Sequence, residues 1–197
     1  MSTPNHRSAP GTSYFVTTKC AQGRFVFQVA ETVQILIDIL LHYRDRGVYL
    51  LHGFVVMPDH LHVLLTPSPT LTLEKAMQLI KGGSSHRIRA ARKTGMQIWQ
   101  IGFHDWTVRD ADDWHSKIEY IHNNPVRARL IQSAEDWPHS SAGGKFQLDP
   151  PPARYQQLSS VAKAVTTNPP ASGLKPRPPE KHWATKSPTI QNGRTNS

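Results

Sequence analysis

The stretch VYLLHGFVVM-PD-HLHVLLT, residues 48–66, predicts two strands joined by a tight turn. Both arms are rich in β-branched and aromatic side chains, which favour strands. Pro58 and Asp59 interrupt them, as turn residues do. This hairpin is the centre from which the rest of the chain can be interpreted.

His60 and His62 stand at alternate positions of the second arm. Alternate side chains of a strand point to the same face, so both imidazoles face one way while Leu61 and Val63 face the other. Two imidazoles on one face can bind a single divalent cation, although imidazole accepts many metals. The alternative is two polar side chains on the solvent face of a half-buried strand.

The segments around the hairpin alternate between strand and helix patterns. An apolar stripe with helical spacing precedes the hairpin, and two further helical segments follow it. The order predicts an α+β fold with an antiparallel sheet, a ferredoxin-like split βαβ sandwich, extended by one C-terminal helix. The expected elements are strand 13–19, helix 28–46, strands 48–57 and 60–66, helix 71–93, a strand within 99–109, and helix 111–124.

The last expected helix carries Tyr120 and Asn124 four residues apart, and therefore on one face. The carbonyl oxygen of Asn124 is a hard ligand suited to Mg²⁺ or Mn²⁺. The alternative is a tyrosine at the edge of the core and an asparagine ending a helix, which Pro125 is expected to close.

Residues 81–93 form a basic run without any acidic residue. Such a run can follow a phosphate backbone, and we expect it to bind nucleic acid. The alternative is a helix face in contact with solvent only. The cations concerned are Lys81, Arg87, Arg89, Arg92 and Lys93.

The net charge of the 197-residue chain is +9, and residues 150–197 supply +6 of it. This last segment is rich in proline, which predicts a disordered basic tail over 148–197 after a domain at 13–147 and a flexible start at 1–12. The single cysteine, Cys20, excludes an intramolecular disulfide. Without a secretory or membrane-spanning apolar run, the expected location is the cytoplasm.

Two motifs together resemble the single-tyrosine HUH transposases, and in particular the branch associated with repetitive extragenic palindromes (REP). They are FVVMPDHLH at 54–62 and YIHNNPVRA at 120–128. The pieces GFHD at 102–105, Arg109, and DWP before two serines at 136–141 are also similar to that branch. Arg129 departs from the pattern, because a glycine usually follows the alanine there, and we expect only a local effect.

The resemblance covers roughly residues 13–145 and implies a ferredoxin-like fold and cleavage of single-stranded, hairpin-associated DNA. It implies that Tyr120 is the nucleophile and forms a covalent phosphotyrosine intermediate. It also implies that His60, His62 and Asn124 hold Mg²⁺ or Mn²⁺. No ATP is needed, because the free DNA end left by cleavage can rejoin.

Two other functions remain open from the sequence. One is a catalytically inactive protein that binds hairpin DNA or RNA, and the other is a metal-dependent phosphodiesterase that uses water. The choice between a monomer and a homodimer is also open.

Overall fold

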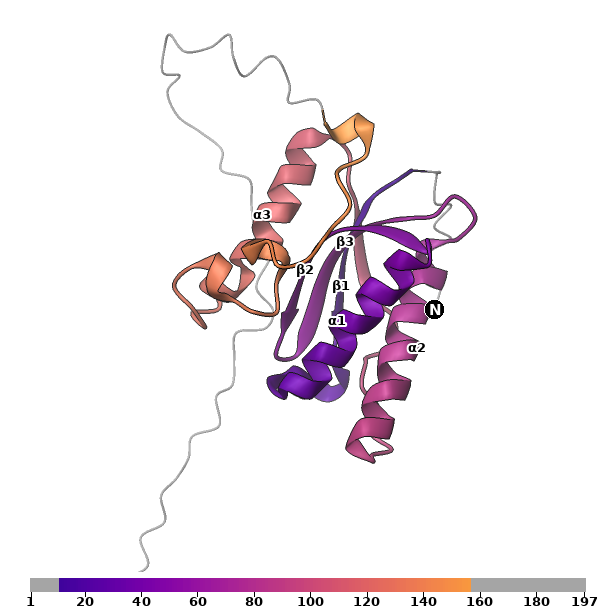
Figure 1. Cartoon of the computed structure of the whole chain (residues 1–197), viewed down its shortest axis with the longest axis vertical. Coiled ribbons are helices and arrows are strands. Elements are labelled where there is room, and N and C mark those ends of the chain that lie inside the picture. Colours follow the sequence, from indigo (N-terminus) through magenta and orange to yellow (C-terminus); the bar gives the residue numbers. More distant parts are fainter. Residues whose placement is uncertain (1–10, 157–197) are drawn as a thin grey trace, which may run out of the picture. The chain divides into compact units, whose positions relative to one another are not determined.

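The computed structural model of the chain describes residues 11–156. Within them, four strands form one antiparallel sheet in the order β2-β3-β1-β4. Helices α1 and α2 cover one face, and α3 packs against the strands separately from them (Figure 1). The elements are β1 (Tyr14–Lys19), α1 (Ala30–Asp45), β2 (Tyr49–Met57), β3 (His60–Pro67), α2 (Leu73–Arg92), β4 (His104–Thr107) and α3 (Ala111–Arg127).

This architecture confirms the predicted α+β fold, with the sheet, the two covering helices and the additional helix all present. The hairpin is also as expected: Met57 pairs with His60 across the Pro58-Asp59 turn. Residues 1–10 of the expected flexible start at 1–12, and the expected tail from residue 157 on, lie outside the described residues.

The sheet buries side chains on both faces. Leu61 and Val63 of β3 belong to the core under α1 and α2, whereas Leu64 belongs to a second core with Trp114 and Ile121 of α3. The alternation predicted for β3 is therefore confirmed, and His62 faces the side on which α3 packs.

Helix α3 approaches β2 closely because Gly53 has no side chain. A Cβ atom at Gly53 would lie 2.7 Å from Cδ1 of Ile118, closer than carbon atoms pack. The side chain of Asp110 begins the helix by accepting a hydrogen bond from the backbone N–H of Asp113 at 2.8 Å. The cap and the close approach together fix where this helix sits on the sheet.

The prediction that Pro125 closes the last helix is wrong, because α3 continues to Arg127. A proline inside a helix has no N–H and so removes one backbone hydrogen bond, but the residues after it can still donate to carbonyl groups of the helix. Here Ala128 N–H donates to the carbonyl of Asn124 at 3.0 Å, and Leu130 N–H donates to that of Pro125 at 3.0 Å. The buried ring of Pro125 is thus accommodated by one further turn.

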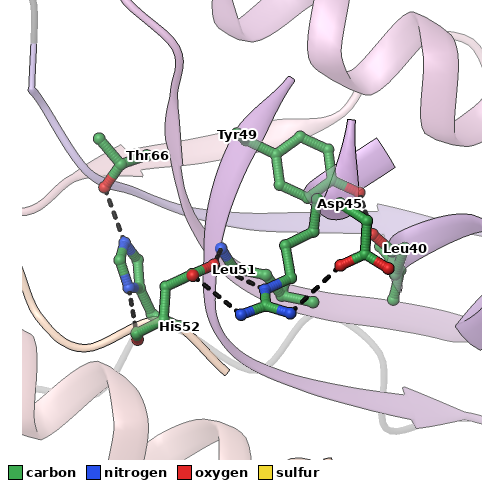
Figure 2. Close-up of polar contacts among 8 residues, drawn as sticks. Leu40, Asp45, Tyr49, Leu51, His52 and Thr66 are labelled. Carbon is green, nitrogen blue, oxygen red and sulfur yellow. Dashed lines mark hydrogen bonds and ion pairs between the residues drawn. The ribbon is translucent and has the colours of Figure 1, made fainter. Parts of the chain in front are cut away.

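The predicted domain end at residue 147 is too early, because the chain packs on the domain as far as Tyr155. The Asp149 carboxylate accepts hydrogen bonds from Arg44 at 2.9 and 3.0 Å, and one from Leu51 N–H at 2.7 Å. Figure 2 shows this cluster of polar contacts beside Leu51 and His52 of β2. The proline-rich composition predicted a tail from residue 148, but the Asp149 carboxylate binds Arg44 and the buried Tyr155 ring stacks on Trp114, with 4.9 Å between centroids.

Candidate active site

The side chains of His60 and His62 meet on the face of the sheet that α3 covers. Their Nε2 atoms lie 3.1 Å apart. The opposite nitrogen of each ring has its own partner: Nδ1 of His60 lies 2.6 Å from the Asp59 carboxylate, and Nδ1 of His62 lies 2.8 Å from Oγ1 of Thr17. The contacts at Nδ1 therefore fix the orientation of both rings, and the two Nε2 atoms point toward each other.

The protonation of this pair favours a cation between the rings. A carboxylate only accepts hydrogen bonds, so Nδ1 of His60 carries a hydrogen, which leaves Nε2 as the nitrogen through which this ring can bind a metal ion. Burial, followed by the nearby charges of His60 and Lys19, holds the pKa of His62 well below its ordinary value. Two lone pairs facing each other repel unless a proton or metal ion lies between them.

The separation of the two nitrogens also fits a shared metal ion. Two ligands about 2.1 Å from one cation, at about 90 to 110° to each other, lie about 3.0 to 3.4 Å apart. No group of three His, Cys, Asp or Glu side chains suited to a metal occurs within residues 11–156. A third protein ligand would thus be of another type, such as an amide oxygen.

Tyr120 of α3 lies beside the two histidines. Its ring is edge-on to that of His62, with 5.3 Å between centroids, and edge-on to that of Phe15 at 5.6 Å. The ring of Phe15 stacks on His62 at 5.4 Å. The structure therefore brings together three of the predicted site residues, His60, His62 and Tyr120, within one chain.

Asn124 lies one helical turn after Tyr120 and is half-buried. Its backbone carbonyl accepts the hydrogen bond that closes the end of α3. Its side chain has no hydrogen bond within the part of the chain that the structure describes. The assignment of Asn124 as a metal ligand consequently stays a prediction.

Three cations that were not singled out from the sequence surround the site. The guanidinium of Arg127 lies 5.0 Å from the Tyr120 ring centroid, and Nζ of Lys117 lies 5.7 Å from that of Phe15. Lys19 is the β1 partner of His60 across the β1–β3 pair. Arg127 follows Tyr120 by seven residues, or two helical turns, and this spacing could have predicted from the sequence that the two share a helix face.

The predicted basic run lies on α2, whose buried residues contact the opposite face of the sheet from α3. Lys81 is engaged there: its ammonium group donates to the carbonyl oxygens of Gln100, at 2.8 Å, and Gly102. Burial lowers the pKa of Lys81 below its ordinary value. Arg89 and Lys93 are exposed.

The other two members of the run have acidic neighbours on α1. Arg87 lies 3.8 Å from Asp38, and Arg92 lies 3.8 Å from Glu31. These distances are long for ion pairs, so both guanidinium groups keep capacity for a phosphate. The structure does not bring the basic run to the tyrosine, and DNA binding by it stays a prediction.

The comparison with known families decides what kind of protein carries this site. Residues 13–124 match the family described as "Transposase IS200 like". The chain belongs to the IS200-like transposase family. The matched segment includes both histidines, Tyr120 and Asn124. Membership makes the protein a DNA-binding transposase, and it confirms the relationship inferred from the two motifs.

Individual relatives agree with this assignment. The REP-associated tyrosine transposase of Escherichia coli (strain K12) is 25% identical over 145 residues, which cover 71% of this chain and 84% of that protein. A putative REP-associated tyrosine transposase of Haemophilus influenzae is 27% identical over 96 residues, covering 44% and 54%.

A solved structure of a REP-associated tyrosine transposase bound to a REP hairpin shares the fold. Its TM-score is 0.62 at 23% identity, and the match covers 81% of this transposase and 96% of that chain.

No helix within the described residues is long and apolar enough to cross a membrane.

Proposed function

We propose that this transposase cleaves and rejoins single-stranded DNA next to a hairpin, with Tyr120 as the nucleophile. The observation that carries the proposal is the packing of the Tyr120 ring against His62, whose Nε2 atom lies 3.1 Å from that of His60. A nucleophile and a cation-binding pair next to each other are what phosphoryl transfer requires.

In the cleavage step, the phenolic oxygen of Tyr120 forms a bond to the scissile phosphorus and loses its proton. The bond from phosphorus to the 3′ oxygen breaks, and that oxygen leaves as a 3′-hydroxyl after gaining a proton. The DNA stays joined to Tyr120 through its 5′-phosphate. In the rejoining step, a 3′-hydroxyl attacks the phosphotyrosine and releases the tyrosine, so one phosphodiester replaces another without ATP.

The ligands proposed for Mg²⁺ or Mn²⁺ are His60, His62 and the amide oxygen of Asn124. When bound, the ion polarises a phosphoryl oxygen and offsets the negative charge that develops in the transition state. Asp59 and Thr17 hold the two imidazoles in the orientation that exposes Nε2. The burial that keeps His62 neutral preserves a lone pair for a ligand.

The DNA substrate is inferred from the cations around the site and from the relatives. Lys19, Lys117 and Arg127 provide positive charge for phosphates beside Tyr120. A hairpin substrate is supported by the solved relative bound to a REP hairpin. The exposed cations of the α2 run, Arg89 and Lys93 above all, would contact DNA on another face.

One chain contributes both histidines and the tyrosine, so a monomer carries these groups together. A homodimer would not need to exchange α3 between its subunits to bring them together. The proposed active unit is therefore a single chain.

The test uses end-labelled hairpin DNA with single-stranded flanks and Mn²⁺, analysed on a denaturing gel. We expect a covalent protein–DNA product that is lost in Tyr120→Phe, which removes only a hydroxyl. Cleavage without an adduct would identify a phosphodiesterase that uses water. Binding without cleavage would identify an inactive hairpin-binding protein.

A further inference from the structure

Trp106 is an exposed aromatic ring on the open edge of the sheet. It belongs to β4, the short outer strand, and 53% of the residue is exposed. Its partner across the β1–β4 pair is Phe15, so the two side chains point to the same face, which is that of Tyr120 and His62. Cross-strand partners lie about 5 Å apart.

Lys117 of α3 connects the two rings. Its Nζ lies 4.7 Å from the Trp106 ring centroid and 5.7 Å from that of Phe15. The ammonium group also lies 3.6 Å from the Asp113 carboxylate, which shares its charge with Arg109 at 3.7 Å. The cation is thus held over exposed aromatic surface beside the proposed nucleophile.

A single exposed apolar side chain on a protein surface is ordinary and needs no function. Ile101 is such a residue, since 97% of it is exposed and no aromatic ring or cation packs on it among residues 11–156. Trp106 differs in three respects: its ring has a face for stacking, a cation lies over it, and one residue, Phe15, separates it from Tyr120.

We propose that Trp106, with Lys117 beside it, is a stacking site for one nucleobase of the single-stranded DNA flanking the scissile phosphate. The proposal rests on the proposed function, because it takes its ligand from the reaction at Tyr120. Every nucleobase has a π-face that stacks on an aromatic ring, while a lysine next to the ring pairs with the phosphate of that nucleotide.

The arrangement gives the flanking strand a direction. The rings of Tyr120, Phe15 and Trp106 follow one another from the site under α3 toward the free edge at β4. Beyond β4 no further strand pairs with the sheet within the described residues, so a DNA strand leaves the site there without obstruction from the sheet. Trp106 then acts in binding and positioning, not in the chemical step.

The test measures binding without cleavage, in the Tyr120→Phe background with the metal removed by a chelator. Hairpin DNA carries 2-aminopurine at successive flank positions, and its fluorescence is quenched when the base stacks. We expect quenching at one position, lost with Trp106→Ala and largely retained with Trp106→Phe. The affinity should fall about 5- to 150-fold with Trp106→Ala, the range for one stacked base.

An abasic nucleotide at that same position should lower the affinity by a similar factor, and the two losses should not add, because each removes the same stack. Ile101→Ala is the matched control and should bind as the unsubstituted chain does. An affinity of Trp106→Ala equal to that of the unsubstituted chain on every flanked hairpin would overturn the proposal, as would a change of oligomeric state with unchanged affinity, which would mark a protein contact.

The proposed function is tested separately, in the unsubstituted chain, which retains both Tyr120 and Trp106. If this protein forms no covalent adduct but still quenches the fluorescence at one flank position, the result contradicts the proposed chemistry and supports the stacking site. Absence of any binding to flanked hairpins would overturn both.

Discussion

Oγ1 of Thr17 on β1 lies 2.8 Å from Nδ1 of His62 on β3. The hydroxyl fixes the ring so that Nε2 points to His60. Partners of this kind orient metal ligands and contribute to their basicity, although they do not touch the metal.

Thr17→Val should therefore raise the Mn²⁺ concentration needed for half-maximal cleavage about 10- to 100-fold. A metal titration of the cleavage rate measures this. The control is Thr18→Val, because Oγ1 of Thr18 is buried without a hydrogen-bond partner among the described residues. That variant should cleave normally and be as stable as the parent or more so. Equal metal dependence of all three proteins would contradict the role of Thr17.

Asn124→Ala should raise the Mn²⁺ requirement as well, because a hard ion loses one oxygen ligand. His60→Ala should nearly abolish cleavage at every Mn²⁺ concentration, since one imidazole alone leaves no pair. Asn123→Ala is the matched control, because Asn123 points about 100° away on the helix and lines the hollow between α3 and residues 134–142. If Asn123→Ala and Asn124→Ala respond alike, Asn124 is not a ligand.

Arg129→Gly should stabilise the protein. Arg129 follows the end of α3 with φ 59°, a left-handed conformation that costs an ordinary residue roughly 1 to 2 kcal/mol. Glycine adopts it freely but loses more entropy on folding, so the expected net gain is about 0.5 to 1 kcal/mol, or about 1 to 4 °C in Tm. Thermal unfolding followed by circular dichroism measures it, and a lower Tm would contradict it.

The left-handed conformation at Arg129 is one that glycine adopts without strain, in agreement with the glycine expected there from the resemblance. The departure at Arg129 is met by a local left-handed turn, and the helix before it is complete. The local effect expected from the sequence at Arg129 therefore corresponds to one left-handed residue after the end of α3.

Asp149 should make part of the stability depend on acid pH. Burial acts to raise the pKa of its carboxyl, but hydrogen bonds from Arg44 and Leu51 N–H outweigh burial and hold the pKa below its ordinary value. A depressed carboxyl pKa contributes stability above the unfolded value of about 4, and that contribution is lost as pH falls through the folded value.

Urea unfolding of the parent and of Asp149→Asn at pH 7 and at pH 3 measures this dependence. The difference in free energy of unfolding between the two should be largest at pH 7 and shrink at pH 3. Asp45→Asn is the control, since Asp45 also contacts Arg44 but its side chain is 67% exposed. A difference that stays constant with pH would contradict the assignment. Comparison with the parent removes the contribution of His62, which does not contact Asp149. His52 contacts the Asp149 backbone carbonyl and is coupled to its charge, so the measured difference includes that interaction.

Local patterns were enough to predict most of the fold and to place two residues of the candidate site on one face. Strand alternation placed His60 and His62 on one face, and the order of strands and helices predicted the sheet, because both depend on neighbouring residues. The motif around Tyr120 implied by resemblance that this residue is the nucleophile, which stays a proposal, and the structure places its ring against His62.

Only the tertiary structure decided which distant residues meet. Thr17 orients His62, which lies 45 residues further along the chain, and Asp149 binds Arg44 across 105 residues. Lys117 lies over the rings of both Phe15 and Trp106. It also separated the α2 basic run from the tyrosine by placing the two on opposite faces of the sheet. No local pattern carries that information, because such contacts depend on how closely α3 packs on β2 at Gly53 and on strand register, both of which are set by packing of the whole core.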